Sequence, residues 1–229
     1  MVTMSKLFNE WTTYEKVVAN DYMHHRRLLT ALALEIDRQL QAPLLVVDLG
    51  CGDCAPITTL VKSFSTKRYV GIDQSERALN GARANLEAAG VSFALHCGTM
   101  LEEMGKLGGG FNLAIASFSL HHLEQSEKQA VLRECRRVIE PGGLLAIIDV
   151  FLKEDESRQN YLQRWESNAR CKFAALEPDE MEELLAHVRA CDRPETYSTY
   201  RKLGEAAGFE HATQIAQDEE RLNRLIILT

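Results

Sequence analysis

The chain has 229 residues, is 45% hydrophobic and carries a formal net charge of −7, which is the composition of an ordinary globular protein. The acidic balance disfavours a nucleic-acid partner, whose phosphates usually require a basic face. The first residues mix charged and aromatic side chains and lack the apolar core of a signal peptide, so we expect a cytoplasmic protein without a membrane segment.

Residues 3–41 are predicted to form a helical lead-in that covers a binding site. This segment contains Tyr14 and Tyr22 and the only dense basic cluster of the chain, His24 to Arg27. Considered alone, the cluster is best explained as a solvated helix face. The segment as a whole carries more aromatic and charged residues than a simple connection requires.

The first predicted strand, Leu44 to Leu49, contains Asp48 and opens at once into a turn with Gly50 and Gly52. Glycines let the backbone turn sharply and approach a ligand closely, and the turn leads into a helix start. As a bare pattern the turn also fits the dinucleotide fingerprint, so a nicotinamide oxidoreductase is a rival interpretation. The carboxylates of Asp48 and Asp53 would repel a pyrophosphate but suit the ammonium and sulfonium of S-adenosylmethionine.

Six cysteines are scattered along the chain, and without a secretory signal we expect reduced thiols. Cys51 and Cys54 have the spacing of a redox motif or of half a zinc site. They lie inside the glycine turn, however, and no second pair of cysteines or histidines has metal-ligand spacing. We therefore expect small residues that fit a tight loop, and no bound metal.

Apolar runs alternate with helical patterns through the following residues, which predicts a parallel sheet covered by helices. Ser75 and Ser126 are the expected N-caps, and Gly90 is the expected end of a helix. The further strands are predicted at Arg68–Ile72, Val91–Cys97, Phe111–Ser117 and Leu144–Phe151, and the helices at Ala55–Phe64, Glu76–Ala89 and Ser126–Ile139.

Residues 153–195 are predicted to be a helical insertion after the fifth strand, with helices around Asn160 to Leu176 and Pro178 to Ala190. A helix over Tyr197 to Ala207 and two short strands then follow, Ala212 to Ala216 and Leu222 to Leu228, which a short turn joins in antiparallel fashion. A dinucleotide domain would instead continue with right-handed crossovers. We expect one domain over residues 1–229, comprising a helical cap (1–41), a cofactor-binding core (42–152), the insertion (153–195) and a C-terminal helix and hairpin (196–229).

From about residue 44 onward the chain resembles the small-molecule branch of the class I S-adenosylmethionine-dependent methyltransferases. The resemblance implies an α/β fold with a Rossmann-like, seven-stranded, mostly parallel sheet, a C-terminal antiparallel hairpin and helices on both faces. It rests on blocks in the family's order: Asp48-Leu-Gly50-Cys-Gly52, Gly71-Ile-Asp73-Gln74-Ser75, Phe111 to Leu123, Val138-Ile-Glu-Pro141-Gly142-Gly143, and the helix end from Leu203 to Phe209.

The resemblance implies S-adenosylmethionine as the cofactor, with Asp73 accepting hydrogen bonds from both ribose hydroxyls and Gln74 bordering the adenine. The family usually has an acid after the third strand, whereas this chain has Thr99 and Met100, so we expect adenine contacts from backbone groups and from Met100. The implied cofactor-binding residues are Asp48, Gly50, Cys51, Gly52, Asp73, Gln74, Thr99, Met100 and Ser117. Asn112 stands where an aspartate is common, at a position we expect to be structural.

Methyl transfer from a sulfonium is an in-line displacement that chiefly requires a well-placed nucleophile, although an alcohol or phenol also benefits from a base. The predicted catalytic residues are His122 and His25, and at least one histidine of the His121-His122 pair is expected to be structural. Lid packing explains the aromatic candidates equally well, and the arginines would suit a substrate carboxylate. The predicted substrate-binding residues are Tyr14, Tyr22, Arg26, Trp165 and Arg170.

The sequence thus predicts an enzyme that transfers a methyl group from S-adenosylmethionine to an O, N or C nucleophile of a small molecule. We expect no nucleic-acid or membrane partner, and homodimerisation stays open. The alternatives are other chemistry on S-adenosylmethionine or a carboxylated derivative, and methylation of tRNA or protein. A nicotinamide oxidoreductase and a non-catalytic cofactor-binding protein are the more distant alternatives.

Overall fold

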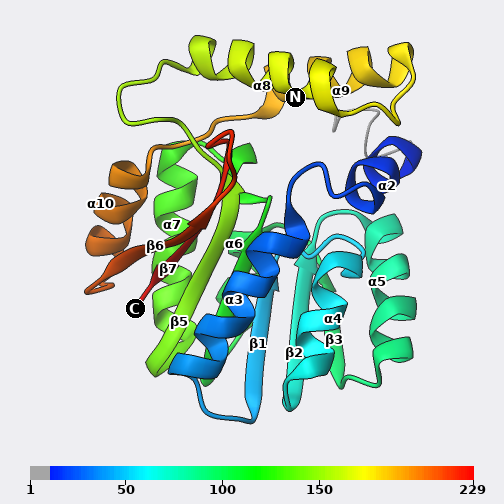
Figure 1. Cartoon of the computed structure of the whole chain (residues 1–229). Helices are drawn as coiled ribbons and strands as arrows, with labels where there is room; N and C mark the ends of the chain where they lie inside the picture. The colour runs from blue at the N-terminus through cyan, green and yellow to red at the C-terminus, as the bar shows by residue number, and fades with distance from the viewer. Residues whose placement is uncertain (1–10) are drawn as a thin grey trace.

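The computed structural model describes residues 11–229, so the first part of the expected N-terminal cap lies outside the described residues. Its centre is a seven-stranded sheet with the strand order β3-β2-β1-β4-β5-β7-β6 (Figure 1). Strands β1 to β5 pair in parallel, and β7 pairs antiparallel with both β5 and β6, as predicted. The strands are β1 (Leu44–Leu49), β2 (Thr66–Asp73), β3 (Phe93–Cys97), β4 (Phe111–Ser117), β5 (Ile139–Val150), β6 (Ala212–Gln217) and β7 (Asn223–Leu228).

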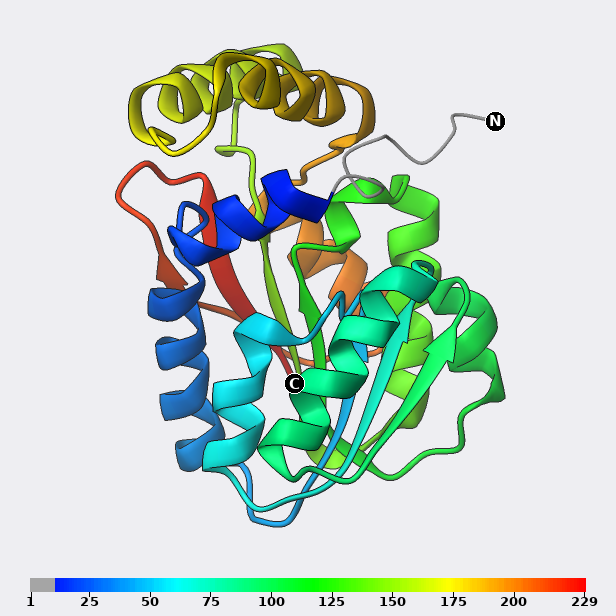
Figure 2. The ribbon, with the colours of Figure 1, turned by 90° about the vertical axis from the view of Figure 1, so that its right-hand side faces the viewer.

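The helices form two layers on the sheet and a third group beyond its edge. Helices α3, α4 and α5 lie on one face, and α6, α7 and α10 lie on the other (Figure 1). Helices α2, α8 and α9 lie across the carboxyl ends of the parallel strands (Figure 2). Their bounds are α2 (Trp11–Ala19), α3 (His25–Gln39), α4 (Ala55–Ser63), α5 (Glu76–Ala89), α6 (Met100–Lys106), α7 (Gln125–Val138), α8 (Arg158–Lys172), α9 (Pro178–Cys191) and α10 (Tyr197–Ala207).

Strand β1 shows why helices cover both faces of the sheet. Val46 is buried in the cluster beneath α3 and α4, whereas Val47 and Leu49 are buried in the cluster beneath α6 and α7. Successive residues of a strand point to opposite faces, so a continuous apolar run needs cover on both sides. Tyr161 and Trp165 of the insertion belong to a third apolar cluster, which also includes Val17 of α2 and Val150 of β5.

Helix starts and ends follow local hydrogen bonding. Helix α5 begins after Ser75, whose Oγ accepts a hydrogen bond from the Ala78 amide at 3.2 Å, and ends at Gly90 with a φ of 70°, as predicted. The predicted cap of α7 at Ser126 is wrong, because Glu124 and Glu127 form a reciprocal capping box two residues earlier. The short helix α6 was not predicted.

Asn112 joins the start of β4 to the chain that enters β1. Its Oδ1 accepts a hydrogen bond from the Leu45 amide at 2.9 Å, and its Nδ2 donates to the Pro43 carbonyl at 3.1 Å. The side chain is buried. Asn112 therefore has the structural role that was expected of it.

Replacing Asn112 with alanine should lower the free energy of unfolding by about 1–3 kcal/mol, because a buried amide and a buried carbonyl lose their partner. Urea denaturation would measure the change. Gly105→Ala is the control, since a Cβ there meets no heavy atom within 4 Å. A helical alanine should raise stability by roughly 0.5–1 kcal/mol. An Asn112→Ala protein as stable as the wild type would contradict this role.

Candidate functional site

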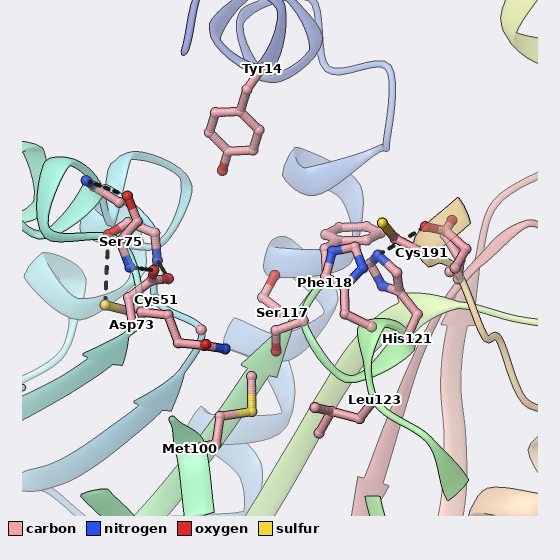
Figure 3. Close-up of a pocket in the computed structure, with 18 of the residues that line it drawn as sticks. Tyr14, Cys51, Asp73, Ser75, Met100, Ser117, Phe118, His121, Leu123 and Cys191 are labelled. Carbon is pink, nitrogen blue, oxygen red and sulfur yellow. Dashed lines mark hydrogen bonds and ion pairs between the residues drawn. The ribbon is translucent and has the colours of Figure 1, made fainter. Parts of the chain in front are cut away.

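A cavity of about 700 Å³ lies at the carboxyl ends of the parallel strands, beneath α2, α8 and α9. Figure 3 shows its polar side chains in two groups. One group, which includes Cys51 and Asp73, surrounds the glycine turn, and we call it the cofactor end. The other includes His121, and we call it the histidine end. Ser117, at the end of β4, lies between them.

The glycine turn is held in one shape by the neighbouring strand and loop. The amides of Gly50 and Cys51 both donate to the Ile72 carbonyl, at 2.8 and 3.0 Å. Gly50 has a φ of +70°, and a Cβ there would lie 2.5 Å from the Ser119 Cβ. Ser119 is itself fixed by donating to the Leu49 carbonyl at 2.7 Å. A side chain at position 50 is therefore excluded both by backbone conformation and by space.

Asp48 is buried at the wall of the cofactor end, with 2% of its surface exposed. Its Oδ2 accepts a hydrogen bond from the Tyr69 hydroxyl at 2.5 Å, but its Oδ1 has no partner among the described residues. Burial raises the pKa of Asp48 to about 7, although the Tyr69 hydrogen bond opposes the shift. A buried carboxylate oxygen without a partner is costly, and an ammonium group of a ligand would satisfy it.

Asp73, at the end of β2, binds two backbone amides. Its Oδ1 accepts from Ser75 at 2.8 Å and its Oδ2 accepts from Gly52 at 2.9 Å. Burial raises the pKa of this carboxyl. Each carboxylate oxygen has a second acceptor position, so the same side chain can still bind a pair of ligand hydroxyls.

The remaining predicted cofactor residues also line the cavity, and these are Cys51, Gln74, Thr99, Met100 and Ser117. Thr99 has a second role, because it caps α6. Its hydroxyl accepts from the Glu102 amide at 3.2 Å and donates to the Glu102 carboxylate at 2.8 Å. The Thr99 hydroxyl is therefore engaged within its own helix turn rather than directed to a ligand.

The expectation that Asp53 would face a cationic ligand together with Asp48 is wrong. The Asp53 side chain turns back to the start of α4, where its Oδ1 accepts a hydrogen bond from the Ala55 amide at 3.0 Å. It is not among the residues that line the cavity. An aspartate next to a helix start commonly binds the backbone two residues on, and this local bond sets its direction.

His121 belongs to the 3₁₀ helix η1 (Leu120–His122) and is buried between two carboxylates. Its Nδ1 lies 2.5 Å from Oδ1 of Asp149, whose Oδ2 accepts a hydrogen bond from the His121 amide at 3.0 Å. Its Nε2 lies 3.7 Å from Oδ1 of Asp192. Burial disfavours the charged imidazole, but the two carboxylates outweigh burial and raise its pKa.

Three other histidines line the cavity and differ from His121 in their electrostatics. The His122 ring lies 4.0 Å from that of His121 and 5.3 Å from that of His187, measured between ring centroids. Burial, with the neighbouring imidazoles, lowers the pKa of His122 well below its usual value and that of His187 to about 4. His25 packs against Phe118, and burial lowers its pKa to about 4. These three rings are neutral near pH 7.

Two of the predicted substrate residues, Tyr14 and Trp165, line the cavity. The Tyr14 hydroxyl would lie 3.7 Å from a Cβ on Gly52, so this ring covers the cofactor end. Burial, with the nearby carboxylates, raises the pKa of Tyr14. Trp165 comes from α8 and packs edge-on against Phe173.

The other predicted substrate residues, Tyr22, Arg26 and Arg170, do not line the cavity, and this corrects the expectation. Tyr22 stacks on Phe173 at 4.4 Å between ring centroids, and its hydroxyl accepts a hydrogen bond from the Ala175 amide at 2.8 Å. Tyr22 therefore secures the insertion to the N-terminal segment.

The two arginines lie on exposed helix surfaces. Arg170 pairs with Glu166 and Glu182 at 2.9 and 2.7 Å, and Arg26 donates to the Ala19 carbonyl at 3.4 Å. Neither is placed to hold a substrate carboxylate. Arg193 does line the cavity, but its guanidinium pairs with Glu124 and donates to the Cys191 carbonyl.

Comparison with known proteins identifies the domain. Residues 46–143 match the family model described as a methyltransferase domain. An uncharacterized methyltransferase of Synechocystis is 31% identical over 105 residues, which are 46% of each chain. A carboxy-S-adenosyl-L-methionine synthase of Klebsiella pneumoniae is 23% identical over 216 residues, or 89% of this chain and 85% of that protein.

Solved structures show the same fold. A putative O-methyltransferase of Nostoc punctiforme superposes with a TM-score of 0.65 at 16% identity, over 90% of this chain and 56% of that one. Human N-acetylserotonin methyltransferase in complex with S-adenosylmethionine gives 0.60 at 19% identity, over 89% and 50%. The chain thus spans about half the length of the Synechocystis, Nostoc and human proteins.

These comparisons confirm the predicted resemblance. Residues 46–143 match a methyltransferase domain, and the fold is that of class I S-adenosylmethionine-dependent methyltransferases. Within residues 11–229 the structure has no helix that is both long and apolar enough to cross a bilayer.

Binding of S-adenosylhomocysteine should release close to one proton at about pH 6 and almost none at about pH 8. In the free protein the pKa of Asp48 is raised to about 7, so this carboxyl is largely protonated at the lower pH. A ligand ammonium next to it would lower the pKa and expel the proton. Calorimetry in buffers of different ionisation enthalpy measures the release. Asp48→Asn should abolish the difference, and equal proton release at both pH values in the wild type would contradict the assignment.

Proposed function

We propose that this chain, which contains a class I S-adenosylmethionine-dependent methyltransferase domain, transfers a methyl group to a small-molecule acceptor. The observation that carries the proposal is the continuity of the cavity, which joins Asp48 and Asp73 at one end to His121 at the other. Bound S-adenosylmethionine would supply the activated methyl group. A volume of about 700 Å³ suits a small organic ligand beneath covering helices.

At the cofactor end we assign Asp48 to the methionine ammonium and Asp73 to the ribose hydroxyls. The unpartnered Oδ1 of Asp48 and the remaining acceptor positions of Asp73 support these roles. Gln74 and Met100 border the adenine, with Thr99 contributing backbone contacts because its hydroxyl is engaged by Glu102. The glycine turn, Cys51 and Ser117 complete the wall.

At the histidine end we propose that His121 removes the proton of a hydroxyl acceptor. Asp149 holds the proton of His121 on Nδ1, which leaves Nε2 to accept another. His25 and His122 were the candidates from sequence, but their lowered pKa values make them weaker bases near pH 7. We assign them to the wall that positions the acceptor.

The acceptor is expected to be uncharged and largely apolar. The lining on this side includes Val17, Leu29, Trp165, Leu184 and Val188. Among the described lining residues, the guanidinium of Arg193 is already paired with Glu124. An acceptor with a free carboxylate would thus have no readily available arginine.

Chemistry on a carboxylated derivative of S-adenosylmethionine remains the second candidate. Relatives named carboxy-S-adenosyl-L-methionine synthase match 89% of this chain, at 22–23% identity. Such a ligand carries one more carboxylate, which requires a cation nearby. The engaged guanidinium of Arg193 argues against it.

Titration of the protein with S-adenosylhomocysteine tests the cofactor assignment. We expect a Kd in the micromolar range and a loss of affinity of about 10- to 100-fold in Asp73→Ala, because hydrogen bonds to a charged group are worth about 1.5–3 kcal/mol. Asp53→Ala is the matched control, since that carboxylate lies outside the cavity, and it should bind like the wild type.

Two results would contradict the proposed methyl transfer. Stabilisation of the wild-type protein by NADH but not by S-adenosylhomocysteine would favour a nicotinamide oxidoreductase, because only a ligand of the native state raises stability. Binding without turnover across a panel of phenols, alcohols, amines and carboxylic acids would favour a non-catalytic cofactor-binding protein.

Replacing His121 with glutamine should lower kcat for a hydroxyl acceptor by about 10²- to 10⁴-fold, the range for loss of a general base. The Kd for S-adenosylhomocysteine should not change, and this also verifies that the variant folds. His25→Gln is the comparison, with a loss of less than about tenfold. A larger loss in His25→Gln than in His121→Gln would reverse the assignment of the base.

A further inference from the structure

Three side chains at the histidine end converge on one point. His121, His122 and Asp192 each offer one ligand atom, and these atoms lie within 4.8 Å of one another. The histidines belong to η1, next to the sheet, whereas Asp192 follows α9 of the insertion. The cluster therefore joins two segments that are distant in sequence.

His121 and Asp192 face each other without a hydrogen bond between them. Because Asp149 binds Nδ1 of His121, Nε2 is the atom that faces Oδ1 of Asp192, at 3.7 Å. This separation is too long for a hydrogen bond. Asp192 is 3% exposed, and its Oδ1 accepts no hydrogen bond from the described residues. A cation that both atoms can bind would stabilise this arrangement, and a metal ion would take the place of a proton on Nε2.

We propose that Nε2 of His121, a ring nitrogen of His122 and Oδ1 of Asp192 form a binding site for a divalent transition metal, best matched by Zn²⁺. Two imidazoles and one carboxylate are a ligand set of zinc and non-haem iron sites that keep coordination positions open. Metal–ligand distances of about 2.0–2.2 Å require these atoms to draw together by roughly an ångström.

Asp149 supports the proposed site because its carboxylate orients one of the ligands, His121. Ligating histidines usually donate their other ring N–H to a carboxylate or carbonyl, which fixes the tautomer and the ring orientation. The Asp149 carboxylate binds both Nδ1 and the backbone amide of His121, and it is fully buried. The imidazole is thus already oriented for coordination through Nε2.

A second cluster with similar spacing, His24, Asp218 and Glu220, does not qualify. The Asp218 carboxylate already accepts hydrogen bonds from the Leu222 amide and from both the amide and the side chain of Asn223. Glu220 pairs with Lys172. Because both oxygens of Asp218 already accept hydrogen bonds, this cluster lacks a third available ligand and provides a control.

The proposed metal would face the acceptor. All three ligands line the cavity, so an open coordination position would lie where an acceptor oxygen can reach it, and the metal would lower the pKa of that hydroxyl so that its proton passes to water. Nε2 of His121 cannot bind a metal and accept a proton at once, so metal assistance would replace proton removal by His121. This catalytic use rests on the proposed function, whereas the metal site itself does not.

Titration of the chelator-treated full chain with Zn²⁺ and with Co²⁺ tests the site. We expect one Zn²⁺ per chain with a Kd of about 1 μM or lower, and visible Co²⁺ absorption typical of four or five ligands. His122→Gln and Asp192→Asn should each weaken Zn²⁺ binding by at least about tenfold, and Asp149→Asn by about 10- to 100-fold. His24→Gln should bind like the wild type.

The affinity for S-adenosylhomocysteine reports folding of each variant independently of the metal. His122 is only half-buried, so His122→Gln keeps the test decisive if Asp192→Asn does not fold. The proposal is overturned if the wild type binds no stoichiometric Zn²⁺ at about 100 μM, if binding survives in His122→Gln, or if His24→Gln abolishes it. Loss of S-adenosylhomocysteine binding by the wild type would instead count against the proposed function alone.

Discussion

The burial of the Asp48 carboxylate at the end of β1 is the constraint on which the cofactor end depends. Strands β1 and β2 pair with Asp48 opposite Gly71, and this register brings the Tyr69 hydroxyl to one carboxylate oxygen. Gly71 has no side chain, and a Cβ there would lie 2.8 Å from the Cys51 Sγ. The glycine turn can therefore pack closely on β2, and the second carboxylate oxygen is left for a ligand.

The cover of the cavity is held by a different kind of contact. Lys16 of α2 pairs with Glu180 of α9 at 2.7 Å, and Tyr22 stacks on Phe173 at the end of α8. Partly exposed ion pairs of this kind contribute little free energy, typically less than about 1 kcal/mol. The cover is thus attached by weak polar contacts and one apolar cluster, which suits a segment that has to admit ligands.

The sheet and the glycine turn were predictable because strand periodicity and glycine placement are local properties of the sequence. The pairing of His121 with Asp149 could not be predicted, because these residues are 28 positions apart and meet only after β4 and β5 pair. Helix faces were also hard to assign. Trp165 and Arg170 lie five positions apart in α8, or about 140° around the helix, so both cannot face one cavity. The structure directs Trp165 inward.

Different segments of the chain build the two ends of the cavity, so the two ends can change independently. Apart from Tyr14, the cofactor end is built from the carboxyl ends of β1 to β4 and the residues that follow them, whereas Trp165, Leu184, Val188 and Asp192 reach the histidine end from one continuous stretch, residues 153–195. That stretch is modular: it can be exchanged or redesigned as a unit while the register between β1 and β2 stays intact. Changes within residues 153–195 can thereby alter the wall around the acceptor while the cofactor end stays the same.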